Sequence, residues 1–262
     1  MKPLKLIAAA AVLGTVSLTS HAALLGRDLN GSPASIEGYY DTALDITWLA
    51  DANLAATNTF GVSGITGTGQ MNWTTANAWI AAMNSASYLG ISSWRLPNLF
   101  DIGGDGCTVY SYSSYNGGDC GYNVVSTGPQ ASELASLYHA TLGNVAYYNT
   151  SGGANYAGPP HIQATGPFQN LGNTLYWYGQ STVTDSSGNN WGEPPLNAWY
   201  FGMPSGGQRP IDMTQVTTMT AWAVFDGDIQ ATVPVPGAVW LLGSAVGLLG
   251  LVKRVRPRAE RA

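Results

Sequence analysis

Two uncharged apolar segments, one near each end, limit the part of this chain that can fold in water. The first, residues 6–18, follows two lysines and precedes Ser20-His21-Ala22, which places small residues at positions −3 and −1 of a cut between Ala22 and Ala23. The run is well short of the roughly 20 residues that a membrane-spanning helix needs. We therefore expect residues 1–22 to be a cleaved signal peptide rather than an N-terminal anchor.

The second apolar segment, residues 237–252, predicts a C-terminal transmembrane helix. As a helix it would be roughly 24 Å long, slightly short of a hydrocarbon core of about 30 Å. Lys253 and Arg254 follow directly, and a basic cluster keeps its end of a span in the cytoplasm. Pro234 and Pro236 precede the segment and predict an extended hinge. The segment is either a permanent anchor or a temporary stop that is removed.

The region between these segments, residues 23–232, is strongly acidic. It contains three arginines, no lysine and 14 acidic residues, which gives a net charge of −11, whereas the whole chain carries −5. Phosphate backbones are bound through lysine and arginine, so we expect no nucleic-acid partner. Its length suits one domain with a core of its own.

Two cysteines, Cys107 and Cys120, lie close together in a stretch rich in glycine, tyrosine and aspartate. In an exported chain such a pair predicts a disulfide, which would contribute about 3 kcal/mol in the chain-entropy account. A metal site on the same cysteines would need two further ligands, and His139 and His161 are the only histidines of residues 23–232.

Local patterns predict an α+β fold with two main helices, short antiparallel strands and long loops rich in glycine and tyrosine. Apolar residues at near-helical spacing predict helices over 72–88, capped by Asn72 or Thr74, and over 132–142. Alternation predicts a strand over 44–49. Further strand candidates are residues 174–178, 198–201, 220–225 and 229–232.

The C-terminal stretch "VPVPGAVWLLGSAVGLLGLVKRVRPR", residues 233–258, resembles the PEP-CTERM sorting signal. That resemblance implies recognition by an exosortase, a membrane cysteine transpeptidase, and removal of the tail during export to the surface of a Gram-negative bacterium. It also implies an inner-membrane intermediate and an association with exopolysaccharide. Val235 stands where the name-giving motif has glutamate.

Six segments of residues 23–232 resemble the Lcl C-terminal domain family. They are "DTALDITWLADAN" (41–53), "MNWTTANAWIAAMN" (71–84), "WRLPN" (94–98), "ASELASLYHATLGN" (131–144), "GPFQN" (166–170) and "AWAVFDGD" (221–228). The resemblance implies a C-type-lectin-like α+β fold, related to that of formylglycine-generating enzymes. It also implies, for some members, adhesion to sulfated or acidic polysaccharides. Phe225 stands where we expect arginine.

The candidate binding residues are one arginine and four tyrosines. Arg95, between Trp94 and Leu96, is interpreted either as an anion or sugar contact or as a fold-fixing ion pair with Asp226 or Asp228. Flat rings with polar tips suit both saccharide stacking and packing of a loop-rich shell. The rings that we consider as ligand contacts are Tyr110, Tyr112, Tyr115 and Tyr122.

Asp101, Asp105 and Asp119 flank the cysteines on glycine-rich loops. Calcium binds clustered carboxylates and carbonyls on such loops, but aspartate beside glycine is also ordinary turn chemistry. We expect no other cofactor.

No nucleophile elbow, zinc-binding helix motif or phosphate-binding loop is present in the sequence, and we expect no enzymatic activity. The leading hypothesis is an exported surface or matrix protein that binds exopolysaccharide or another surface polymer, in adhesion or biofilm. One alternative is an envelope component that binds other proteins. The other is a secreted hydrolase, since two suitably placed carboxylates can serve a glycosidase.

Overall fold

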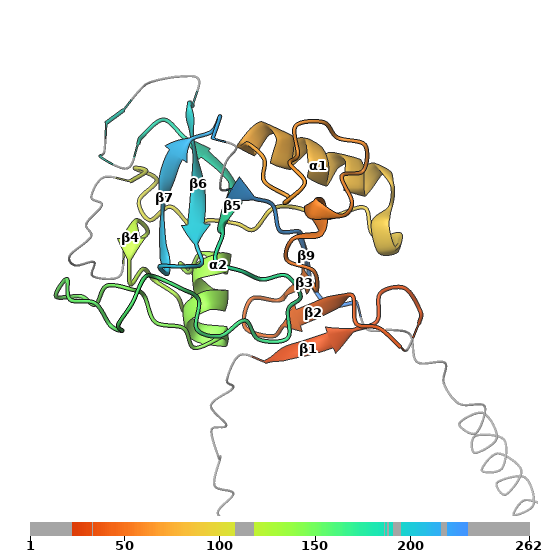
Figure 1. Cartoon of the computed structure of the whole chain (residues 1–262), viewed down its shortest axis with the longest axis horizontal. Coiled ribbons are helices and arrows are strands. Elements are labelled where there is room, and N and C mark those ends of the chain that lie inside the picture. The colour runs from red at the N-terminus through yellow and green to blue at the C-terminus, as the bar shows by residue number, and fades with distance from the viewer. Residues whose placement is uncertain are drawn as a thin grey trace, which may run out of the picture.

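The computed structural model describes residues 23–32, 34–107, 118–185, 187, 189–190, 195–215 and 219–229. These residues form two β-sheets with little helix (Figure 1). The predicted signal peptide (1–22) and sorting signal (233–258) lie outside them. Among the described residues, no helix is both long and apolar enough to cross a membrane.

The first sheet has the strand order β1-β2-β3-β9 and is antiparallel throughout. It joins the beginning of the described chain to its end, because β9 pairs with β3 from a position almost 180 residues further along the sequence. Its strands are β1 (Leu24–Arg27), β2 (Gly38–Asp41), β3 (Ile46–Leu49) and β9 (Val224–Asp226).

The second sheet has the order β4-β7-β6-β5-β8. β5 and β8 are parallel, the other pairs are antiparallel, and the register between β5 and β6 shifts between Trp177 and Ser181. Its strands are β4 (Gly121–Tyr122), β5 (Leu175–Thr182), β6 (Asn197–Gly202), β7 (Gly207–Asp212) and β8 (Met219–Thr220).

The helix predicted over 72–88 is confirmed as α1 (Trp73–Ser85). The side chain of Asn72 accepts a hydrogen bond from the backbone N–H of Thr75 at 2.8 Å, which satisfies one of the donors that the first turn leaves unpaired. The helix ends earlier than predicted, and a 3₁₀ turn, η2 (Tyr88–Gly90), follows it. A second 3₁₀ turn, η1 (Leu54–Ala56), precedes α1.

The α+β prediction with two main helices is wrong. The helix expected over 132–142 is one short α segment, α2 (Glu133–Ala135), that widens into a π-type segment, η3 (Ser136–Thr141). Four strands were not predicted, among them β7, so the described chain is mainly sheet and the C-type-lectin-like α+β architecture is not retained. The predicted transmembrane helix belongs to no described element, because residues 237–252 lie outside the described residues.

The core lies between the two sheets and is built from aromatic rings. Trp222, between β8 and β9, packs against Trp48 of β3 at 4.8 Å and against Tyr176 of β5 at 5.5 Å between ring centroids. Its indole N–H donates to the carbonyl of Leu49 at 2.8 Å, so the buried polar atom is satisfied. One buried cluster therefore contains residues of both sheets.

Candidate functional site

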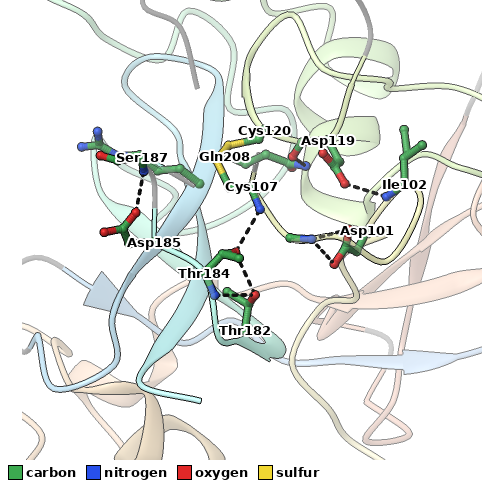
Figure 2. Close-up of a disulfide and its surroundings, with 12 residues drawn as sticks. Asp101, Ile102, Cys107, Asp119, Cys120, Thr182, Thr184, Asp185, Ser187 and Gln208 are labelled. Carbon is green, nitrogen blue, oxygen red and sulfur yellow. Dashed lines mark hydrogen bonds between the residues drawn. A yellow bond between two sulfur atoms is a disulfide. The ribbon is translucent and has the colours of Figure 1, made fainter. Parts of the chain in front are cut away.

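The disulfide predicted from the cysteine pair is confirmed. Cys107 and Cys120 are bonded, with their Cα atoms 5.5 Å apart, and both are fully buried (Figure 2). The backbone N–H of Cys107 donates to Oγ1 of Thr184 at 3.1 Å, just beyond β5. Cys120 directly precedes β4. The bond thus lies beside the second sheet, between the end of β5 and the start of β4.

A buried amide, that of Gln208 on β7, ties this corner to its surroundings (Figure 2). Its Nε2 donates to the carbonyl of Asp119 at 2.6 Å and to Oγ of Ser132 at 3.2 Å. Its Oε1 accepts from the hydroxyl of Tyr178 at 2.7 Å. One side chain therefore links the disulfide loop, the start of α2 and β5.

The three aspartates considered for calcium are brought together beside the disulfide. Asp101, Asp105 and Asp119 each offer an oxygen, and these oxygens lie within 4.8 Å of one another. Asp101 accepts hydrogen bonds from the backbone N–H of Gly106 at 3.1 and 3.2 Å, and Asp119 accepts from that of Ile102 at 2.6 Å. Asp101 therefore fixes a turn of its own loop, whereas Asp119 ties the segment around Cys120 to that loop.

The surroundings of the three aspartates disfavour a negative charge on Asp119. Burial, followed by the nearby carboxylate of Asp101, raises the pKa of Asp119 to about 6. Oxygen donors are the kind that calcium prefers, but calcium takes about six to eight of them, and several here already accept backbone hydrogen bonds. Nothing beyond the acidic cluster itself points to an ion, so calcium binding stays a prediction.

Arg95 lies in a network of ion pairs, as one of its two interpretations required. Its guanidinium donates twice to Glu133 at 2.8 Å, and to Asp226 at 3.0 and 2.5 Å. Nη1 also donates to the carbonyl of Leu96 at 3.1 Å, and the backbone of Arg95 bridges Val224 of β9. All three nitrogens of the guanidinium are thus used to join the 94–98 segment, α2 and β9.

The other two arginines of residues 23–232 are also engaged within the fold. Arg27 on β1 makes two hydrogen bonds to Asp228, at 2.5 and 2.8 Å. On β7, Arg209 donates to the hydroxyl of Tyr200 at 2.5 Å, and its guanidinium lies 5.7 Å from the centre of that ring. The positive charge of this region therefore serves internal contacts.

The predicted tyrosine site is only partly described. Tyr122 is buried on β4, and its ring packs against Tyr148 with centroids 5.0 Å apart, so it contributes to packing.

Among the predicted processing residues, Ala23 is described: it precedes β1, and its N–H donates to the hydroxyl of Thr42. The remaining predicted residues lie outside the described residues: Tyr110, Tyr112, Tyr115, Ala22, Pro234, Pro236, Lys253 and Arg254.

His139 lies inside the fold, on the π-type segment. Its ring nitrogens face the backbone carbonyls of Asn144 and Gly206, each at 3.2 Å. Burial lowers the pKa of this histidine, and its neighbours are the rings of Tyr138 and Phe201. The surroundings are those of a packing residue.

Sequence reasoning missed a surface cleft of about 710 Å³ between the β2–β3 turn and α2. Its wall includes Leu44, Asn98, Phe100 and Pro129. Phe100 is 40% exposed, whereas the large rings of the core are buried. No local pattern signals the cleft, because its wall is assembled from segments that lie far apart in the sequence.

The fold and this site define an acidic, mainly β domain that is closed by one disulfide. No family model matches the chain, and no curated protein or solved structure that was compared with it matches either. The resemblances to the PEP-CTERM signal and to the Lcl C-terminal domain therefore stay predictions.

Proposed function

We propose that this chain is an exported surface or matrix protein that binds exopolysaccharide. In this proposal an exosortase recognises residues 233–258, a PEP-CTERM-type sorting signal, after the secretion machinery has removed residues 1–22. The apolar segment 237–252 contacts the inner membrane only transiently. Residues 23–232, an Lcl C-terminal-like domain, reach the surface of a Gram-negative cell.

The observation that carries the proposal is the disulfide between Cys107 and Cys120. Disulfides form and persist in oxidising compartments and are rare in the cytosol. The bond lies in the core, where it closes a loop against the second sheet. A buried disulfide therefore indicates an exported protein. The two terminal segments of the sequence indicate export independently.

The internal contacts of the arginines indicate which kind of polymer the domain binds. All three arginines of the domain are held in internal contacts, with Arg95 and Arg27 in ion pairs and Arg209 against Tyr200. Binding to sulfate or carboxylate groups relies on arginine or lysine, and residues 23–232 contain no lysine. The proposal therefore favours an uncharged polymer over the acidic ones that the Lcl resemblance implies.

Processing is tested by intact mass spectrometry of the protein isolated from its native host. The expected mass lacks residues 1–22 and the tail that begins near Pro234. A variant with Pro234→Ala and Pro236→Ala should keep the tail and stay in the inner membrane. The matched control is Pro160→Ala, an exposed proline far from the signal, which should be processed as the wild-type protein is. A wild-type protein that retains the tail at the surface contradicts exosortase processing.

Binding is tested on the same exported protein by co-sedimentation with exopolysaccharide purified from the host. Retention of the wild-type protein is the expected result. If the protein is exported but instead sediments only with other envelope proteins, it is an assembly component. If it shortens the polysaccharide, it is a hydrolase, and either result replaces the binding proposal.

A further inference from the structure

The cleft between the β2–β3 turn and α2 has the dimensions of a ligand site. Its volume of about 710 Å³ falls within the roughly 300–1,000 Å³ of small-molecule sites. Three separated parts of the chain form its wall: the turn at 43–44, the loop at 98–100 and residues 127–140. Because these parts come from a sheet turn, a loop and a helix, the cleft is formed only in the folded domain.

The charge of the cleft is compensated. Among the described residues that form its wall, Glu133 is the only charged one. Both of its carboxylate oxygens accept hydrogen bonds from Arg95, and one also accepts from the backbone N–H of Asn98 at 2.7 Å. Arg95 in turn also binds Asp226. An anionic ligand therefore meets no cation of the described chain that is not already bound, so an uncharged ligand fits best.

The wall combines one exposed ring with polar groups that can still bond. Phe100 presents its ring at 40% exposure. Asn98 uses its Oδ1 to accept from Gln180 at 3.1 Å, and within the described part of the chain its Nδ2 has no partner. Thr127 adds a hydroxyl to the same wall. A flat apolar ring beside amide and hydroxyl groups matches the apolar face and the hydroxyl edge of a sugar ring.

We propose that this cleft binds a neutral saccharide, with a sugar ring stacked on Phe100 and its hydroxyl groups bonded to Asn98 and Thr127. This inference rests on the proposed function and specifies it, because it assigns the polymer contact to the cleft rather than to the tyrosine loop. A protein segment would fit an apolar groove better, whereas here the polar side chains of the wall interrupt the apolar surface. These are Asn98, Thr127, Glu133 and Ser136.

The test uses the exported full protein on an array that carries neutral glucans, mannans and galactans beside uronate and sulfated oligosaccharides. Wild-type protein should bind neutral members, and Phe100→Ala should lower the affinity at least tenfold. Phe100→Trp should restore it, because the larger ring still stacks. The matched control is Leu196→Ala, which removes a similarly exposed apolar side chain that is not part of the cleft. Phe100 is exposed, so the variants should fold with unchanged melting temperatures.

Three results would overturn the cleft assignment: no binding to any neutral member, equal binding by Phe100→Ala, or preferential binding to the sulfated or uronate members. Co-sedimentation with the host exopolysaccharide separates this failure from failure of the proposed function. If Phe100→Ala sediments as the wild-type protein does, the polymer binds elsewhere and the function stands. If the wild-type protein does not sediment, the function itself fails.

Discussion

Two regions of this molecule hold distant chain segments together by opposite means. In the first, which we term the ionic corner, Arg27 binds Asp228, and Arg95 binds Glu133 and Asp226. These pairs fasten β1, the 94–98 segment and α2 to the end of β9 and the residues after it. Each contact has a carboxylate and a guanidinium, so opposite charges compensate each other.

The second region, the disulfide corner, contains Cys107, Cys120 and the aspartates 101, 105 and 119. Here the carboxylates meet backbone N–H groups and one another rather than a cation. Arg27 and Arg95, two of the three arginines of this acidic domain, both lie in the ionic corner. A covalent bond fastens the region where carboxylates crowd together.

The largest effect should come from removing the disulfide. Replacing both cysteines by alanine should lower the free energy of unfolding by about 3 kcal/mol, or roughly 6–12 °C in melting temperature for a domain of this size. Differential scanning calorimetry of the full-length protein checks this. Because the chain has two cysteines, a reductant should destabilise the wild-type protein and leave the double variant unchanged. Equal stability of all forms would mean that hydrogen bonds alone hold the corner.

The next effect concerns Arg95. Arg95→Met should lower the free energy of unfolding by about 2–3 kcal/mol, because it leaves the largely buried carboxylate of Glu133 without its cation. Arg95→Lys should lose less, since it keeps the charge but not the two parallel hydrogen bonds. Urea unfolding measures both. If Arg95→Met together with Glu133→Gln is no more stable than Arg95→Met alone, the stranded carboxylate is not the cause.

A smaller effect is expected at Arg27. Arg27 binds one carboxylate, that of Asp228, whereas Arg95 binds two, so Arg27→Gln should cost less, about 1 kcal/mol at low salt. Raising the salt to about 1 M should reduce the difference, since the Debye length falls to about 3 Å. The loss that follows removal of the disulfide should not respond to salt. Salt dependence of both variants alike would end the distinction between the two corners.

Local patterns predicted the parts of this fold that follow local rules. The cap and spacing of α1, the strand β3 and the positions of β5 and β6 are all visible in short windows of sequence. The strands β2 and β7 were missed because Gly-Tyr-Tyr-Asp has no alternation and Gly-Gln-Arg-Pro-Ile-Asp contains a proline. Pairing within a sheet overrode these weak propensities, and so the fold class was wrong.

The site shows the same limit. The disulfide and the approach of Asp101 to Asp119 were predictable, because all of these residues lie within one glycine-rich stretch. The pairing of Arg95 with Asp226 was one of two interpretations of a flanked arginine. The cleft at Phe100 was not predictable, since the turn at 43–44 and residues 127–140 approach it only through the arrangement of the sheets.

The effect that most directly contrasts the two corners is the response to pH. The folded protein raises the pKa of Asp119 to about 6, against about 3.9 in an unfolded chain. Between these values the folded state binds a proton that the unfolded state does not, so this group adds stability as pH falls from above 6 towards 4 and loses it as pH rises through 6. Asp119→Asn removes that dependence while keeping an oxygen for the N–H of Ile102. The variant should therefore be more stable than the wild-type protein at pH 8, and the difference should shrink by pH 5.

The matched control for this titration is Asp212→Asn on β7, where hydrogen bonds from the N–H and hydroxyl of Thr214 lower the pKa of the carboxyl. Its charge is stabilising above the unfolded pKa and that contribution is lost as pH falls, so the variant should be less stable than the wild-type protein at pH 7 and should converge with it in acid. Thermal unfolding from about pH 3 to 8 measures both differences, and EDTA keeps any effect of calcium on the aspartates out of the comparison. If Asp119→Asn and Asp212→Asn change the stability at pH 7–8 in the same direction, the disulfide corner does not carry uncompensated charge. The contrast with the ionic corner would then rest on the covalent bond alone.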